Sequence, residues 1–154
     1  MFRILKSLLV LTIGVHALVY ALQNLANLES ARGFVAAVLT RAEQAAYPDT
    51  FAFGIENPTL IGAALWTVIL GELLVGLLGL KGVWDMARAR GPAFEAAKLY
   101  GLLACGLALL VWFGLFLVIG GGFFQMWQTE LGSASMVGSF QFAEMSGIVM
   151  LFVA

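Results

Sequence analysis

The sequence predicts an all-α membrane protein, a bundle of four transmembrane helices, and three observations lead to this prediction. Of the 154 residues, 62% are hydrophobic and only 11% are charged, whereas a soluble domain carries about 25% charged residues. Four apolar stretches are each long enough to cross about 30 Å of hydrocarbon as a helix. These stretches lack the polar alternation of barrel strands, and helices are the other way to satisfy backbone hydrogen bonds inside lipid.

The four predicted spans belong to one membrane domain that covers residues 1–154, and they run over residues 4–22, 59–80, 99–119 and 136–153. They are separated by three loops, which cover residues 23–58, 81–98 and 120–135. Six of the eight basic residues precede the first span or lie in the second loop: Arg3, Lys6, Lys81, Arg88, Arg90 and Lys98. The positive-inside rule therefore predicts that this loop and both termini are cytoplasmic.

An alternative for residues 1–21 is a cleavable signal peptide. Arg3 and Lys6 precede an apolar run that ends in Val19-Tyr20-Ala21, which resembles a signal-peptide cleavage site. The run is long for the apolar region of a signal peptide, so we favour a retained transmembrane helix.

The first loop contains the largest polar region, and from Ser30 to Tyr47 its pattern predicts an outer helix. Apolar residues recur there at helical spacing, at Phe34, Val35, Val38, Leu39 and Ala42. We expect Ser30 to cap this helix and Pro48 to end it. The helix would lie along the membrane interface or cover the bundle. It either shields the bundle or serves as a lid or a docking surface for a partner.

Glycine and proline mark the remaining boundaries. Asn57-Pro58 is expected to begin the second span, and Gly91-Pro92 to break the helical pattern of the basic loop. The third span is expected to end at residues 120–122, which are all glycine.

The aromatic loop after these glycines includes Phe124, Trp127 and Gln128. It is either an interfacial aromatic belt or a short apolar element that dips into the membrane, with the glycines allowing close backbone approach.

Polar side chains inside the spans are the candidate functional residues. His16, Glu72 and Glu144 lie within spans, and Gln141 lies about one turn from Glu144. Because a charge at mid-bilayer costs roughly 2.5–3.5 kcal/mol even on lenient scales, each ionisable group should face the interior, be neutral or find a partner. Their depths along the helices are similar, so we hypothesise that the three ionisable residues form a cluster.

Glu72 is the strongest of these candidates. Gly76 and Gly79 lie four and seven residues further along, on the same helix face, and small residues allow a neighbouring helix to approach closely. Gly71 and Gly101 are further candidates for helix packing. Three interpretations of Glu72 stay open: a protonated acid that holds two helices together, a proton relay or ligand site, or a contact with another protein.

Other kinds of chemistry lack support in the sequence. His16 is the only histidine, which excludes bis-histidine haem ligation within one chain, and Cys105 is the only cysteine. We see no metal-ligand spacing, phosphate-binding loop or nucleophile with a base. The sequence therefore predicts no metal, no cofactor and no catalytic residues, and a net charge of −1 gives no basic surface for nucleic acid.

Several motifs resemble a bacterial family of predicted small integral membrane proteins, domain of unknown function 2165. The resemblance covers nearly the whole chain, and these segments carry it: Trp112-Phe113-Gly114, the run from Phe116 to Gly121, Phe124, Met126-Trp127-Gln128, Phe140, Phe142, Met145, Asn57-Pro58, Trp66 and Glu72. Gly122 and Phe123 stand where the family pattern would have an acidic residue and an aromatic, and Gln141 where it would have arginine. The resemblance implies four helices in a bacterial inner membrane, and no known activity.

Three functions remain. The first is an accessory or structural subunit that packs in a larger membrane complex, with partners that are other membrane subunits or further copies of the chain. The second is a small transporter, channel, or lipid- or quinone-binding protein that uses His16, Glu72 and Glu144. A membrane enzyme ranks last.

Overall fold

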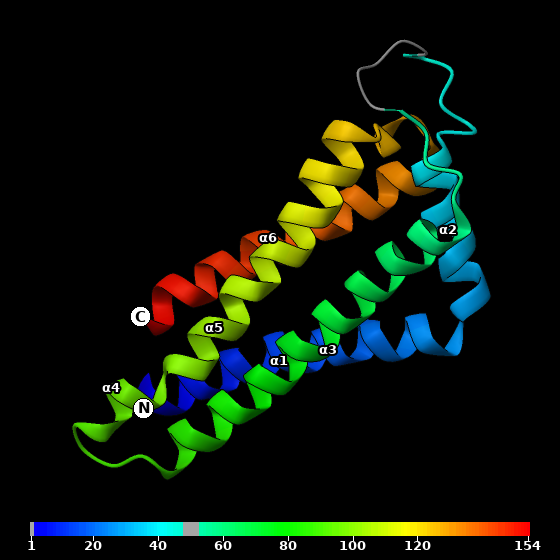
Figure 1. Cartoon of the computed structure of the whole chain (residues 1–154). Coiled ribbons are helices and arrows are strands. Elements are labelled where there is room, and N and C mark those ends of the chain that lie inside the picture. The colour runs from blue at the N-terminus through cyan, green and yellow to red at the C-terminus, as the bar shows by residue number, and fades with distance from the viewer. Residues whose placement is uncertain (1, 48–52) are drawn as a thin grey trace.

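The computed structural model describes residues 2–47 and 53–154, and the regular structure of these residues is entirely helical. Four helical segments are long and apolar enough to cross a membrane, so the predicted all-α class with four spans is confirmed (Figure 1). The elements are α1 (Phe2–Ala26), α2 (Leu28–Thr40), α3 (Pro58–Arg88), α4 (Ala93–Ala97), α5 (Leu99–Ala108), η1 (Leu109–Phe123), η2 (Met126–Gln128) and α6 (Glu130–Val153).

The bundle has two different ends (Figure 1). One, which we call the α4 end, holds α4, the start of α1 and the end of α6. The other, the α2 end, holds α2, which turns away from α1 at Asn27 and runs to the start of α3. The six basic residues grouped by the sequence lie toward the α4 end, whereas Arg32 and Arg41 belong to the α2 end.

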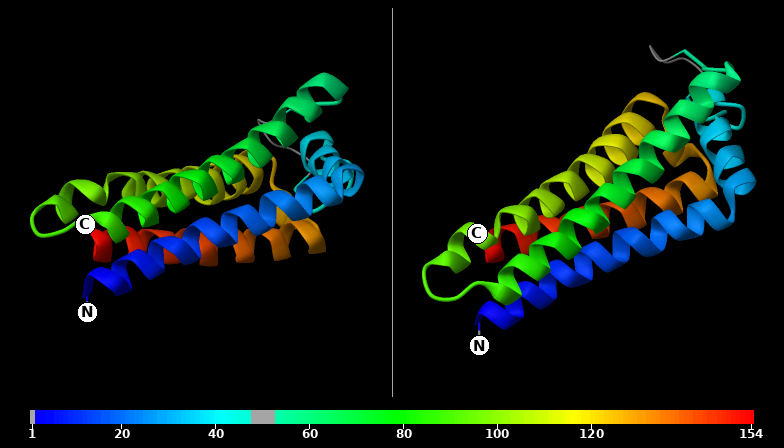
Figure 2. Two further views of the ribbon diagram at one scale, coloured as in Figure 1. Left: turned by 90° about the horizontal axis from the view of Figure 1, so that it is seen from below. Right: turned by 60° about the horizontal axis from the view of Figure 1, so that its bottom comes forward.

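Glycines set the closest helix contacts. In Figure 2, α1 runs along α3, and this pair meets where Gly14 faces Gly79. A Cβ on Gly79 would lie 2.8 Å from the Cα of Gly14. Further toward the α4 end, a Cβ on Gly82 would lie 2.8 Å from the Cα of Gly101, so α3 and α5 also touch through their backbones. Such close approach replaces the hydrophobic driving force that helices lack in lipid.

The α3 helix begins where the sequence predicted. The side chain of Asn57 accepts hydrogen bonds from the backbone N–H of Thr59 at 2.9 Å and of Leu60 at 3.3 Å, and Pro58 follows as the first helical residue. The helix ends at Arg88, and Gly91, with φ of +57°, and Pro92 follow before α4 begins.

The helix α2 differs at both ends from the helix predicted for residues 30–47. Its N-cap is Asn27, so the assignment of Ser30 was wrong, and Ser30 lies inside the first turns. It ends at Thr40, because Arg41 adopts a left-handed conformation with φ of 59° and its N–H bonds to the carbonyl of Val38. Pro48, the predicted terminator, lies outside the described residues.

The third span changes character midway. After α5, the segment η1 is a π-helix of 15 residues, in which backbone hydrogen bonds join residues five apart. The prediction that residues 120–122 end this span was wrong, since η1 continues to Phe123 and the N–H of Phe124 still bonds to the carbonyl of Ile119 at 3.0 Å. A π-helix is wider than an α-helix, and η1 contributes residues to the wall of a cavity in the bundle.

At the α4 end, lysines cap the last turn of α6. Lys6 donates to the carbonyl of Val153 at 3.0 Å, and Lys98 donates to the carbonyl of Ala154 at 2.6 Å. Lys98 is buried and also pairs with Glu95. Cations at a helix C-terminus satisfy free carbonyls and complement the helix dipole, so these contacts hold α6 against α1 and α5.

Candidate functional site

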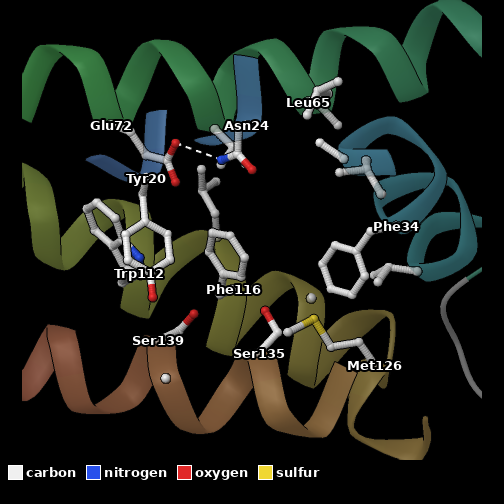
Figure 3. A pocket seen from close by; sticks show the side chains of 18 of the residues that line it. Tyr20, Asn24, Phe34, Leu65, Glu72, Trp112, Phe116, Met126, Ser135 and Ser139 are labelled. Carbon is white, nitrogen blue, oxygen red and sulfur yellow. Dashed lines mark hydrogen bonds between the residues drawn. The ribbon is translucent and has the colours of Figure 1, made fainter. Parts of the chain in front are cut away.

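The half of the bundle next to the α2 end encloses a cavity of about 640 Å³. It lies between the pair α1 and α3 and the pair η1 and α6, with α2 closing its far end (Figure 3). Most of its wall is apolar, and its polar groups come mainly from α1, α3 and α6. A volume of this size suits a drug-sized or lipid-like molecule.

Glu72 provides the one formal charge at the cavity wall among the described residues. Its side chain projects from α3 and is only 1% exposed. The Nδ2 of Asn24, on α1, donates a hydrogen bond of 2.9 Å to Oε2 of Glu72 (Figure 3). The other oxygen, Oε1, makes no hydrogen bond with a described residue and lies at the cavity. Oε2 thus links α3 to α1 through Asn24, whereas Oε1 is available to a ligand in the cavity.

Aromatic rings surround this polar end. The ring of His16 stacks on Phe142 at 3.9 Å and on Tyr20 at 4.7 Å between centroids. Trp112, from η1, meets Phe142 edge-on at 4.4 Å and Tyr20 at 6.4 Å. Trp112 and Tyr20 flank the space below Glu72, and Phe116 lies beside them (Figure 3). These rings give the cavity rigid faces and edges against which a planar or cationic group packs.

The opposite end of the cavity is apolar. Phe34 of α2 points into it, with Leu65 of α3 and Met126 of η2 on either side (Figure 3). Met126 is buried because Gly120 leaves room for it, since a Cβ on Gly120 would lie 2.7 Å from the Sδ of Met126. The cavity is therefore amphipathic, with Glu72 at one end and hydrocarbon at the other.

The cavity is not fully enclosed, because several of its lining residues are exposed. Gln23 on α1 and both Leu131 and Ala134 on α6 line it and are also exposed, Leu131 by 65%. Ser135 and Ser139 extend the α6 wall inward, and their hydroxyls face the cavity (Figure 3).

The hypothesised cluster of three ionisable residues does not form. His16 and Glu72 line the same cavity, but Glu144 and Gln141 are exposed on the other side of α6. Glu144 makes no hydrogen bond or ion pair with any described residue. The sequence predicted that Glu144 lies at a similar depth to Glu72, but the exposed side chain of Glu144 does not line the cavity.

The other sequence candidates take part in packing. Gly76 lies against Leu18 of α1, and Gly79 against Gly14, on the same side of α3 as Glu72. A Cβ on Gly71 would lie 2.8 Å from a methyl group of Val111, and one on Gly101 would lie 3.0 Å from a methyl group of Val10.

The aromatic loop contributes to the site and to its cover. Phe124 lines the cavity. Trp127 packs against Tyr47 with a centroid distance of 5.4 Å, and Oε1 of Gln128 accepts a hydrogen bond of 2.9 Å from the N–H of Tyr47. These contacts join the aromatic loop to the segment after α2.

Sequence reasoning missed Asn24, Tyr20 and Trp112. A signal for the first two was present, because His16, Tyr20 and Asn24 are spaced four residues apart and so share one face of a helix. The predicted first span ended at residue 22, whereas α1 runs to Ala26 and includes Asn24. Trp112 has no such signal, since every neighbouring position in η1 is also apolar.

This arrangement favours binding of an amphipathic molecule. Among residues 2–47 and 53–154 no group of three or more His, Cys, Asp or Glu side chains could hold a metal ion. The polar end offers one free carboxyl oxygen, an amide and aromatic faces, which are recognition groups.

Comparison with known protein families gives a match over nearly the whole chain. The family model described as predicted small integral membrane protein, domain of unknown function 2165, matches residues 2–154. No curated protein and no solved structure shows significant similarity to the chain.

Proposed function

The chain belongs to the family of predicted small integral membrane proteins called domain of unknown function 2165, and we propose from its cavity that it binds an amphipathic, lipid-soluble molecule inside the membrane. The observation that carries this proposal is the buried carboxyl of Glu72 at one end of an apolar cavity of about 640 Å³. This is the lipid- or quinone-binding function, with His16 and Glu72 in the site and without Glu144.

The exposed lining residues of α1 and α6 support entry from the bilayer. A ligand would pass between α1 and α6, place its polar group near Glu72 and Asn24, and leave its apolar part near Phe34. Burial of apolar surface would then drive binding, and the few polar groups would orient the ligand.

The family resemblance and the charges support a location. We propose that the chain lies in a bacterial inner membrane, as the resemblance implies, with the α4 end and both termini in the cytoplasm, because basic residues gather at that end. The cavity then opens to the outer leaflet, and α2 lies at the outer interface, where its apolar face covers the cavity.

The test is to purify the protein in mild detergent, extract it with organic solvent, and identify retained small molecules by mass spectrometry. Ser135→Trp would place an indole in the cavity, because the Ser135 hydroxyl points into it (Figure 3). Ser133→Trp is the matched control, since Ser133 is exposed on the same helix and does not line the cavity. We expect the unaltered protein and the control to retain one amphipathic species that Ser135→Trp loses. Equal retention by both variants would refute the proposal.

A second function, an accessory subunit of a membrane complex, rests on a separate observation. Gln141 and Glu144 lie one turn apart on α6, are exposed at membrane depth and face away from the bundle. Polar groups in lipid are costly unless they meet a partner, so this face suits another membrane subunit or a second copy of the chain.

Native mass spectrometry tests this second function. We expect the unaltered chain to run as a complex and the double variant Gln141→Leu with Glu144→Leu to run as a monomer. A monomeric unaltered chain in the mildest detergents would count against an accessory role.

A further inference from the structure

Building on the proposed function, we propose that the ligand of the cavity is a hydrophobic organic cation, such as a quaternary ammonium or phosphonium ion, which binds in exchange for a proton on Glu72. The balance is simple. The neutral carboxylic acid releases its proton to water, the cation enters, and the resulting carboxylate pairs with it. The net charge inside the cavity is the same before and after.

The charges around the cavity support a cation. None of the eight Lys and Arg residues is among the described residues that line it. Glu72 has an amide as its hydrogen-bond donor and no basic side chain beside it. A buried carboxylate without a cation is unfavourable at membrane depth, so it either holds a proton or awaits a positive partner from outside the chain.

The geometry of Glu72 leaves a place for that partner. The Nδ2 of Asn24 donates to Oε2 at 2.9 Å, while Oε1 has no hydrogen-bond partner among the described residues. The residue is 1% exposed, and its carboxyl borders the cavity (Figure 3). Oε1 is therefore accessible only from the cavity side, next to a space large enough for a ligand.

The aromatic rings supply the second half of a cation site. Tyr20, Trp112 and Phe116 lie around the space next to Glu72, and Phe34 points into the far end (Figure 3). Phe124 also lines the cavity. Ring faces attract cations, and more strongly where water is excluded. A cation that is shielded by its own apolar substituents is weakly hydrated, so it loses little hydration free energy on entering the cavity. It is still attracted by both the aromatic rings and the carboxylate.

Other ligand charges fit less well. An anion would be repelled by the carboxylate and would find no basic side chain among the lining residues. A neutral ligand that accepts a hydrogen bond would need Glu72 to keep its proton. A cavity built for such a ligand would bind a cationic probe and an anionic probe of the same shape equally well. These two cases are distinguishable outcomes of one experiment.

The experiment measures equilibrium binding of tetraphenylphosphonium and tetraphenylborate, two ions of the same shape and opposite charge, to the full chain in detergent at pH 8. We expect the phosphonium to bind at least about tenfold more tightly than the borate. Glu72→Gln should abolish this preference, because glutamine can still accept the bond from Asn24 but carries no charge. Glu130→Gln is the control, since Glu130 is exposed at the α2 end and outside the cavity.

Proton exchange gives an independent readout. Phosphonium binding should weaken as pH falls from 8 to 5, and in weak buffer it should release up to one proton per bound cation. His16 and Tyr20 on α1 are the other titratable groups lining the cavity, and the described residues of α2, η1 and α6 contribute none. His16→Gln should therefore keep the pH dependence, while Glu72→Gln should remove it.

The outcomes separate this inference from the proposed function. If both ions bind equally and Ser135→Trp abolishes both, the cavity binds ligands without selecting cations, and only the present inference fails. If Ser135→Trp leaves binding of both ions unchanged, the cavity is not the site and both proposals fail. If Glu72→Gln folds normally and still prefers the phosphonium, Glu72 is not the partner and the exchange is overturned.

Discussion

One carboxyl oxygen of the buried Glu72 has a structural role, because it accepts a hydrogen bond from the neighbouring helix. Its Oε2 and the amide of Asn24 join α3 to α1 at 2.9 Å, on the α2-end side of the contact between Gly14 and Gly79. Interhelical hydrogen bonds in membrane proteins contribute about 0.6 kcal/mol on average and at most about 1.7 kcal/mol. The contact is thus a modest stabilising element, and a residue kept for packing alone would not need to leave Oε1 free.

Replacement of Glu72 should reveal these two roles. Glu72→Gln should leave the free energy of unfolding nearly unchanged, because the glutamine carbonyl can replace Oε2. Glu72→Leu should lower it by about 1 kcal/mol, since the amide of Asn24 then lacks its acceptor. Unfolding in mixed micelles with increasing SDS measures this difference. In a double-mutant cycle with Asn24→Leu, the two losses should not add, and strict additivity would show that the pair is not coupled.

The sequence predicted the environment of Glu72 and misjudged that of Glu144, for a physical reason. Around Glu72, the glycines at positions 76 and 79 mark the buried face of α3. On α6 the buried face is marked instead by small polar residues, Ser139 and Ser146, and the larger polar groups Gln141 and Glu144 lie on the opposite side. In a membrane helix residue size indicates the packed face better than polarity does, because lipid and core are equally apolar.

At the scale of elements, the crossing of α1 and α3 positions the cavity wall. Gly14 and Gly79 bring the two backbones together near the α4 end, while toward the α2 end the helices carry Asn24, Tyr20 and Glu72. A larger residue at the crossing would push the helices apart and would also move the carboxyl relative to its amide partner. Packing at the glycines and geometry at the site are therefore linked.

Gly79→Ala tests this contact. The added Cβ would lie 2.8 Å from the Cα of Gly14, which is backbone and cannot rotate away. Overpacking of this kind costs about 1–3 kcal/mol. Gly106→Ala is the control, because a Cβ there meets nothing within 4 Å, and alanine in a helix is favoured over glycine by about 0.5–1 kcal/mol. SDS unfolding should show loss of stability for Gly79→Ala alone. Equal midpoints for both variants would contradict the close contact.

The π-helical η1 is the element that sequence patterns could not predict. Its residues, from Leu109 to Phe123, are apolar throughout apart from glycine, so no periodic pattern distinguishes hydrogen bonds to the fourth residue from bonds to the fifth. The change of pitch brings Trp112, Phe116 and Gly120 to the cavity from one segment. The glycines at 120 and 121 leave room for Met126 and Met136 rather than ending the helix.

For the whole molecule, the main asymmetry is between its two ends. The α4 end is closed by buried contacts, with Lys98 and Lys6 holding the last turn of α6. The α2 end is hollow, and its cover is α2 with the aromatic loop. The cavity therefore lies toward one end of the spans, and the leaflet at that end depends on the orientation of the chain in the membrane.

Orientation can be measured with single cysteines, because Cys105 is the only native one and is buried. In a Cys105→Ala background, Glu56→Cys reports the α2 end and Arg90→Cys the α4 end, since both positions are exposed. The positive-inside rule predicts that a membrane-impermeant maleimide labels intact cells at position 56 and not at position 90. A permeant maleimide should label both. The reverse pattern would place the cavity in the cytoplasmic leaflet, so that Glu72 would exchange its proton and its cation with the interior of the cell.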